Sequence, residues 1–479
     1  MLRGMDPFTP AVELAAAIRR KDVSPVEVAD LYLERIEQLE PTLNAFAHRA
    51  DDDVRDAAKR AADLVATTPE DELPPFVGVP LPIKDLNPVQ GWPCTYGSNG
   101  AARGPRAASD PIVDRFVDAG FILLGMTNSP EFGTISFTES AAHGVTRNPW
   151  QPDHTPGGSS GGAAAAVASG MAPIAHASDG GGSIRIPASC CGLVGLKASR
   201  ARVNNEFFEM EGLVSEGVVT RTVADTAAAL DVLGVVDPHA FTNAPHPEPG
   251  HSWAELAQRD PGRLRVGFTT TPPIDVPVDP ACVAAVERAA AALGDAGHDV
   301  FEAGIDVGTP EEFLGSFTTI WNTGSVWSPV EDWDAIEPLN AALRDAARAV
   351  DSLAFAEAVR ATQRLVRHAV AHWGRDFDVL LTPTMATLPP RCGSVWEGGD
   401  ADPVAPLFNC VPMAVFTSVC NVTGLPAINV PVHHDDASGL PVGVHVIAAP
   451  WRDDVALQLA TQLELALPWN DRRPNVGAL

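Results

Sequence analysis

Two glycine-rich turns organise this sequence: Pro-Gly-Gly-Ser-Ser-Gly-Gly at residues 156–162 and Asp-Gly-Gly-Gly-Ser-Ile-Arg-Ile-Pro at residues 179–187. The small residues 162–170 between them predict a helix that can pack very closely. Glycine occurs where the backbone takes a positive φ or approaches another group closely, and consecutive glycines leave N–H groups free to converge on one anion. A serine at the end of such a turn has an oxyanion site beside it, so Ser183 is the predicted nucleophile.

The composition is that of an acidic globular protein. The chain has 479 residues, of which 45% are hydrophobic and 20% charged, and this length suits one large α/β domain or two to three smaller ones. The formal net charge of −28 argues against nucleic acid or an anionic membrane as a partner. Seven cysteines show no zinc or redox spacing. With no apolar signal segment and no run of about 18 apolar residues, this pattern favours a reducing, cytoplasmic setting.

Helices and strands alternate in the first part of the chain. Thr9 and Ser24 are the expected caps of the first two helices, and Ser24 precedes Pro25 and Glu27, a typical helix start. Helices are predicted over residues 10–39, 51–67 and 110–119, and strands over 76–85 and 121–124. This βα alternation indicates a sheet that is covered by helices on both faces.

The same alternation continues after the glycine turns. Strands are predicted over residues 173–177, 194–197, 265–268, 299–302 and 378–383. Helices are predicted over residues 279–296 and 452–465, over most of residues 310–373, and in the second part of residues 218–233, where a strand leads into a helix. Residues 425–432 and 440–448 flank a polar turn and predict a β-hairpin. Residues 388–408 are rich in proline and glycine and predict a mobile flap.

Lys84 is one of only four lysines in the chain, with Lys21, Lys59 and Lys197. It follows the apolar residues 81–83, which favours an inward position, and a buried lysine loses its charge readily because desolvation disfavours the ammonium. A lysine at the surface, or one paired with Asp85, is the equally weighted alternative.

Three kinds of chemistry suit the serines. Residues 157–161 match the Gly-x-Ser-x-Gly nucleophile elbow, but an elbow follows a strand, and the proline-rich residues 148–156 do not suit a central strand. A phosphate-binding loop is disfavoured, because these turns lack the Gly-Lys-Ser/Thr sequence that such a loop contains. The third alternative is a neutral Lys84 acting as base for the two glycine-turn serines, a variant of the catalytic triad.

The two turns resemble the amidase signature family, together with residues 82–85, 127–133, 146–150, 192–197 and 421–427. The resemblance spans nearly the whole chain and is closest to bacterial members that act on oligoamides and aryl amides. It implies an α/β fold with a large mixed β-sheet sandwiched by helices. It also implies a single domain over residues 1–479, with an N-terminal helical part (1–75) and variable substrate-pocket helices and a flap at roughly 300–410.

The resemblance assigns the catalytic roles to Lys84, Ser159 and Ser183. Lys84 is the base, Ser159 follows a cis peptide bond and relays the proton, and Ser183 attacks the carbonyl. The implied oxyanion hole consists of the backbone N–H groups of Gly180, Gly181, Gly182 and Ser183. Ser160 is expected to support the network, and Asp179 and Arg185 to form a structural ion pair.

This sequence departs from the family pattern at two positions. Position 180 is glycine where many members carry a branched residue, which is expected to loosen the wall beside the oxyanion. Position 126 is methionine where lysine is common, and no catalytic effect is expected.

The predicted substrate is a bulky, aryl or oligomeric amide, such as a nylon oligomer. A carbamate (urethane) or an aryl ester is the alternative for the same site, and a Ser-His-Asp hydrolase or an inactive scaffold is less favoured. The expected pocket segments are residues 132–137, 204–210 and 321–327 with the flap, and the expected substrate contacts are Phe132, Gly133, Phe207, Trp321 and Trp327. We expect no cofactor, no metal, no nucleic acid and no membrane, and leave a homodimer open.

Overall fold

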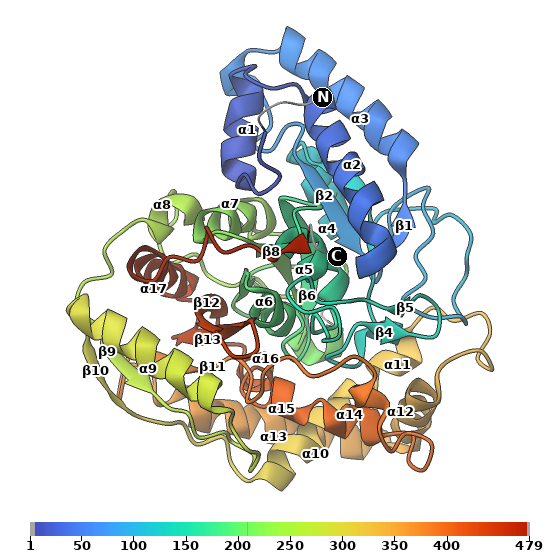
Figure 1. Ribbon diagram of the computed structural model, residues 1–479. Coiled ribbons are helices and arrows are strands. Elements are labelled where there is room, and N and C mark those ends of the chain that lie inside the picture. Colours follow the sequence, from blue (N-terminus) through green and yellow to red (C-terminus); the bar gives the residue numbers. More distant parts are fainter. Residues whose placement is uncertain (1–4, 208, 477–479) are drawn as a thin grey trace.

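An eight-stranded mixed sheet forms the centre of the computed structural model, which describes residues 5–207 and 209–476 (Figure 1). The strand order is β10-β9-β11-β13-β12-β7-β8-β6. The strands are β6 (Ile174–Asp179), β7 (Val194–Lys197), β8 (Ser215–Thr220), β9 (Arg265–Phe268), β10 (Asp299–Glu302), β11 (Val379–Pro383), β12 (Ala427–Asp435) and β13 (Leu440–Ala448). β9 pairs in parallel with β10 and β11, and the other neighbours are antiparallel. The predicted large mixed sheet and the β12–β13 hairpin are confirmed.

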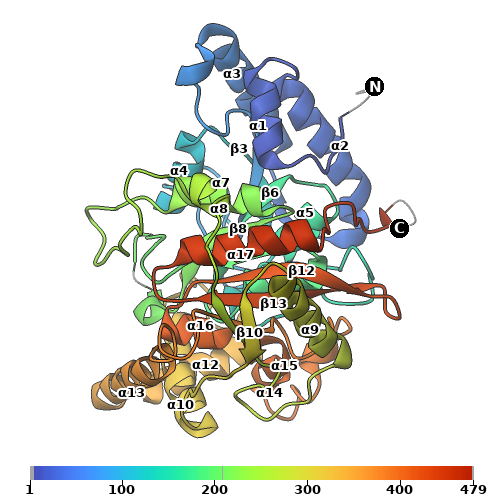
Figure 2. The same ribbon diagram turned by 90° about the vertical axis from the view of Figure 1, so that its left-hand side faces the viewer.

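Helices cover the sheet on both sides, as the βα alternation predicts. Figure 2 shows α17 (Asp453–Ala466) along one face over β12 and β13, with α16 (Ser418–Thr423) on the opposite side. α7 (Val223–Leu233) and α9 (Pro280–Asp295) pack against α17 and the strands. The large sheet is therefore buried on both faces, which explains why most of its strands read as apolar runs.

A small second sheet carries the N-terminal part. β3 (Ile122–Thr127) lies between β1 (Phe46–Arg49), to which it is antiparallel, and β2 (Pro80–Lys84), to which it is parallel. The helices α1 (Ala11–Arg19), α2 (Pro25–Leu43) and α3 (Asp51–Thr67) surround it in the blue region of Figure 1. β2 lies against β6 of the large sheet, so Lys84 at its end is carried to the glycine turns.

The two predicted helix caps have different outcomes. Ser24 forms a full capping box: its hydroxyl accepts from the Val26 N–H at 3.2 Å, and Glu27 accepts from the Ser24 N–H at 2.9 Å. Thr9 is not a cap, because its hydroxyl donates to the Asp6 carbonyl and α1 begins after Pro10 without a side-chain cap.

The other elements connect these two sheets and cover the C-terminal side. They are α4 (Pro111–Asp118), β4 (Glu139–Ser140), β5 (Gly144–Val145), α5 (Gly161–Ala168), α6 (Arg185–Cys191), α8 (Trp253–Ala257), α10 (Pro310–Trp321), α11 (Gly324–Trp327), α12 (Pro338–Ala349), α13 (Ser352–Val370), α14 (Ala405–Asn409) and α15 (Val411–Ala414), with 3-10 turns at Glu70–Glu72, Glu131–Gly133, Glu209–Gly212 and Ser394–Trp396. The predicted helical region 310–373 is thus confirmed.

The proline- and glycine-rich segment 388–408 is attached to the body of the protein. Buried Glu139 accepts hydrogen bonds from the Gly393 N–H at 2.8 Å and from the Trp396 indole N–H at 3.0 Å. The Thr155 N–H donates to the Pro390 carbonyl at 2.9 Å. These contacts hold the segment beside the first glycine turn, and its mobility stays a prediction.

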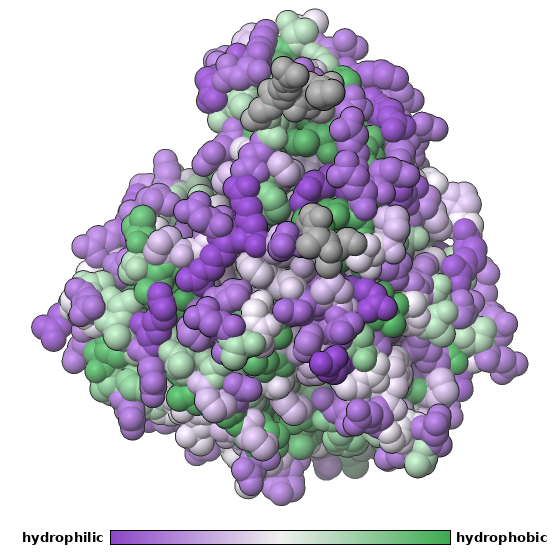
Figure 3. Space-filling view, in the orientation of Figure 1, coloured by the Kyte–Doolittle hydropathy of each residue, from purple (hydrophilic) through white to green (hydrophobic). Residues whose placement is uncertain are grey.

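Hydrophilic residues cover most of the face in Figure 3, as expected for a net charge of −28. None of the helices in residues 5–207 and 209–476 is long and apolar enough to cross a membrane.

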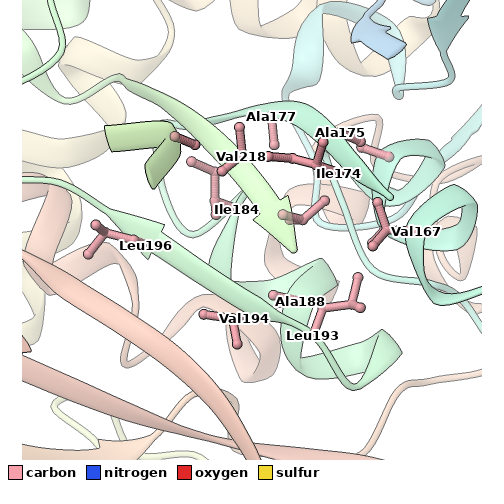
Figure 4. Close-up of a cluster of buried hydrophobic side chains, with 14 of the residues drawn as sticks. Val167, Ile174, Ala175, Ala177, Ile184, Ala188, Leu193, Val194, Leu196 and Val218 are labelled. Atoms are coloured by element: carbon pink, nitrogen blue, oxygen red, sulfur yellow. The ribbon is translucent and has the colours of Figure 1, made fainter. Parts of the chain in front are cut away.

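α5 and α6 pack at the centre of the core on either side of the second glycine turn. Figure 4 shows Val167 of α5 and Ala188 of α6 in one apolar cluster with Ile174 of β6 and Val218 of β8. A Cβ atom at Gly162 would lie 2.5 Å from both the Ala45 carbonyl and the Asn128 N–H. Glycine is therefore required there because backbone from other segments touches the start of α5.

We expect Gly162→Ala to lower the free energy of unfolding by about 1–3 kcal/mol, because overpacked cores must shift neighbouring atoms. Gly315→Ala is the matched control, since Gly315 lies inside α10 and a Cβ there meets nothing within 4 Å. That substitution is expected to stabilise by about 0.5–1 kcal/mol through helix propensity. Chemical denaturation of both variants measures the difference, and equal effects of the two changes would contradict the packing argument.

Candidate active site

The Lys84 amine is buried at the end of β2, where it contacts two serines. Its Nζ lies 2.8 Å from Ser159 Oγ and 3.1 Å from Ser178 Oγ, and the side chain has no solvent exposure. Asp85 accepts instead from the Thr95 N–H at 2.8 Å. Of the two positions considered from the sequence, Lys84 therefore takes the inward one and does not pair with Asp85.

Burial lowers the pKa of Lys84 to about 7, although the negative charges of Glu216, Asp179 and Glu209 act in the opposite direction. An amine with this pKa is largely neutral above neutral pH, so its lone pair can accept the proton of Ser159.

The first glycine turn places Ser159 after a cis peptide bond between Gly158 and Ser159. Ser160 directly precedes α5 without a side-chain cap, and its hydroxyl donates to the Ser178 carbonyl at 3.2 Å. The residues before Ser159 form no strand, so the nucleophile elbow is not built here. The geometry pairs Ser159 with Lys84 rather than with a histidine.

The second glycine turn connects β6 to α6 and carries Ser183, which is 7% exposed. The Gly182 N–H donates to Asp179 Oδ1 at 2.7 Å, so this N–H is already occupied and the predicted inclusion of Gly182 in the oxyanion hole is wrong. Within the described residues, the N–H groups of Gly180, Gly181 and Ser183 donate to no acceptor. Three of the four predicted donors thus remain free to bind an oxyanion.

Asp179 and Arg185 form a fully buried, bidentate ion pair below this turn. Arg185 donates to the two Asp179 oxygens at 2.8 and 2.9 Å, and Asn421 donates to Asp179 at 2.9 Å. Burial works to raise the pKa of Asp179, but the Arg185 charge and these hydrogen bonds outweigh it and hold the pKa well below its usual range. The pair fixes the backbone that follows it, since Asp179 also accepts from the Ile184 N–H at 3.1 Å.

Trp321 lies directly against the second glycine turn. A Cβ at Gly180 would lie 2.8 Å from Trp321 Cζ3. The indole is buried and stacks on Phe317, with 5.3 Å between ring centroids. The expected loosening of the wall at position 180 is therefore wrong, because the Trp321 ring fills the space that a branched side chain would take.

The other predicted substrate contacts divide into two groups. A Cβ at Gly133 would lie 3.2 Å from Ser159 Oγ, so Gly133 borders the predicted relay serine, and Phe132 precedes it in the chain. Trp327 is 84% exposed and forms no buried wall. Phe207 is 68% exposed, but it lines a cavity of about 30 Å³ with Val214 and Glu216. Phe208 of the predicted 204–210 segment lies outside the described residues.

Several residues of the site escaped the sequence prediction. Ser178 precedes the predicted ion-pair residue Asp179, and its alternation on β6 is the signal that places it on the Lys84 side. Asn421 and Thr417 come from more than 200 residues away, and Thr417 accepts from Arg185 through its carbonyl at 2.9 Å. No local pattern indicates such a contact.

All seven cysteines are free, and six of them are buried. Among residues 5–207 and 209–476, no three histidine, cysteine or acidic side chains form a group that could hold a metal ion.

Comparison with known proteins gives one consistent family. Residues 27–457 match the amidase family. A 6-aminohexanoate-cyclic-dimer hydrolase of Paenarthrobacter ureafaciens is 35% identical over 98% of this chain and 97% of that protein.

Solved structures agree with the sequence comparison. The structure of 6-aminohexanoate cyclic dimer hydrolase complexed with substrate has a TM-score of 0.90 at 33% identity, and the match covers 98% of this chain and all of that one. A bacterial aryl acylamidase of the amidase signature family has a TM-score of 0.86 at 26% identity, over 96% and 97% of the two chains.

We expect Asp179→Asn to lower the free energy of unfolding by about 3–5 kcal/mol, because it leaves the Arg185 cation buried without its counter-charge. Asp22→Asn is the matched control, since Asp22 pairs with Arg20 at 2.8 Å on the surface, where ion pairs contribute little. Urea unfolding of both variants provides the measurement. Equal stability of Asp179→Asn and the parent would show that the buried pair does not hold the turn.

Proposed function

The chain belongs to the amidase family of amide hydrolases, and from this premise we propose that it cleaves carboxamide C–N bonds with Ser183 as nucleophile, Ser159 as proton relay and Lys84 as base. The observation that carries the proposal is the buried contact of 2.8 Å between Lys84 Nζ and Ser159 Oγ. An uncharged amine at hydrogen-bond distance from a serine is the arrangement that a Ser-Lys relay requires.

The proposed reaction has two halves. Lys84 takes the proton of Ser159, and Ser159 takes the proton of Ser183 as Ser183 Oγ attacks the substrate carbonyl. The N–H groups of Gly180 and Gly181 support this proposal, because free donors beside the nucleophile stabilise the oxyanion.

Collapse of the tetrahedral intermediate breaks the C–N bond. Ser159 returns a proton to the leaving nitrogen, and Lys84 returns its proton to Ser159, so the amine product leaves neutral. Water then gives its proton to the same relay, attacks the acyl-enzyme and releases the acid, which restores the Ser183 hydroxyl.

The substrate that we propose is a bulky, aryl or oligomeric amide. The likeness to a hydrolase of a cyclic 6-aminohexanoate dimer supports it. So does the wall formed by Trp321 and Phe317, which offers aromatic surface beside the glycine turn. Gly133 and Phe132 would border the substrate on the Ser159 side. Carbamates and aryl esters present the same carbonyl to the nucleophile, and they form the comparison set.

We also propose that the enzyme works in a reducing, cytoplasmic setting. Its seven cysteines are all free, which suits a compartment where thiols stay reduced.

We expect an aryl fluorophosphonate to add once to the intact protein and not at all to Ser183→Ala. Ser160→Ala is the matched control, because its hydroxyl lies in the neighbouring turn and it is expected to keep the adduct. Intact-protein mass spectrometry reads the result, and a panel of anilides, oligoamides, carbamates and aryl esters then ranks the substrates. An adduct on Ser183→Ala would refute the assignment of the nucleophile.

We expect kcat/KM to rise about tenfold per pH unit below pH 7 and to level off above it, because the pKa of Lys84 is about 7 and only its neutral form accepts a proton. Below this pKa, Lys84 is protonated and cannot act as a base, so kcat/KM falls as the pH falls. The measurement is the pH–rate profile of an amide substrate.

Lys197→Met is the control for this profile. Lys197 is the other buried lysine, and among the described residues its amine donates only to the Ala198 carbonyl, at 2.9 Å. The midpoint should therefore not move. A flat profile from about pH 6 to 10 would contradict the relay.

A further inference from the structure

A patch of polar side chains lies under the Lys84 amine on one face of the large sheet. His176 and Ser178 are two residues apart on β6, so both face the same side. Glu216 of β8 pairs directly with Ser178 across the antiparallel ladder, and paired residues project to one face. Because Ser178 Oγ touches Lys84 Nζ at 3.1 Å, Glu216 lies on the side of the sheet that faces the amine.

A chain of hydrogen bonds connects Glu216 to the strand of Lys84. The Lys84 backbone N–H donates to His176 Nδ1 at 3.3 Å, which makes Nδ1 an acceptor. The ring proton therefore resides on Nε2, which lies 2.9 Å from Glu216 Oε2 and donates to it. Asn87 donates to the other Glu216 oxygen at 3.1 Å. At most 5% of Glu216, His176 or Asn87 is exposed.

Glu216 keeps a net negative charge in this arrangement. His176 is neutral as the Nε2–H tautomer, whereas Asp179 on the opposite face is neutralised by Arg185. Burial works to raise the pKa of Glu216, but the hydrogen bonds from His176 and Asn87 help to hold its pKa below the usual value.

Two more acids complete the surroundings of this carboxylate. Asp110 shares the Asn87 and Asn205 amides with Glu216, and Glu209 lies in the exposed turn that lines the same small cavity. Among the described residues, the ion-pair partner of Glu216 is the neutral His176 alone.

We propose that Glu216, held by His176, is a positioning residue that supplies the counter-charge for Lys84 at the moment of proton transfer. This inference rests on the proposed function. When Lys84 takes the proton of Ser159, an ammonium forms in a buried site, which is costly without a nearby negative charge. A carboxylate in direct contact would keep Lys84 protonated at rest, whereas one beside Ser178 stabilises the ammonium and leaves the resting amine neutral.

The test reads Lys84 directly in the folded protein. Lysine labelled with ¹³C at Cε gives signals from four residues, and the signal that disappears in Lys84→Met identifies Lys84. We expect Lys84 to titrate near pH 7 in the parent and about one pH unit lower in Glu216→Gln. Glutamine keeps the shape and the acceptor for His176 but removes the charge.

Kinetics provide the second readout. In Glu216→Gln the midpoint of the pH–rate profile is expected to fall with the NMR midpoint, and the plateau of kcat to drop about three- to tenfold, because a weaker base transfers the proton less readily. Glu216→Asp keeps the charge and is expected to restore most of the parent midpoint. A role limited to packing would lower kcat in both variants without moving either midpoint.

Asp110→Asn is the matched control, because it removes a carboxylate from the same amide pair but preserves the cap of α4. Its midpoint is expected to stay at the parent value, and a shift as large as that of Glu216→Gln would overturn the assignment. An unchanged Lys84 midpoint in Glu216→Gln would overturn it even if the enzyme is an active amidase. A shifted midpoint in a protein without amidase activity would refute the proposed function alone.

If Glu216→Gln does not fold, ¹⁵N spectra of histidine in the parent protein provide the test. We expect the Nε2–H tautomer of His176, because its Nδ1 accepts from the Lys84 backbone N–H. An imidazolium at this position would cancel the Glu216 charge and overturn the proposal.

Discussion

The arrangement of the site depends on a lysine amine that is buried without an ion-pair partner among the described residues. Lys84 has no solvent exposure, and within residues 5–207 and 209–476 its amine hydrogen-bonds only to hydroxyl and carbonyl oxygens. Ionisation at rest would therefore place a cation in the core without a direct partner. Two buried acids near the amine are kept out of direct contact with it. Asp179 is turned to the opposite face of the sheet and neutralised by Arg185, while Glu216 is kept one strand away.

The sequence predicts the residues that we propose for catalysis better than it predicts their surroundings. Residues 156–162 and 179–187 have a local pattern, because glycine turns, a following serine and small-residue helices are properties of consecutive residues. Lys84 is recognisable from its apolar neighbours and from the rarity of lysine. Most strands and helices are also predictable, because their apolar patterns are local. The Ser24 cap is predictable because its partners are only two and three residues away.

The parts that escape prediction depend on contacts between distant segments. The Gly182 N–H is lost to the oxyanion hole because the Asp179 carboxylate, held by Arg185 and Asn421, turns back to accept it. The wall at Gly180 is closed by Trp321, about 140 positions further along the chain. Neither of these choices has a signature in the neighbouring residues.

The support of Arg185 has a consequence for the order in which the protein becomes active during its synthesis. Lys84 belongs to the small N-terminal sheet, whereas the Arg185 side chain is held by Thr417, Asn421 and His445 near the other end of the chain. A chain still emerging from the ribosome contains both serines long before it contains these supports. The turn that carries Ser183, the nucleophile that we propose, therefore gains the full support of Arg185 only after residues 417–445 have been made.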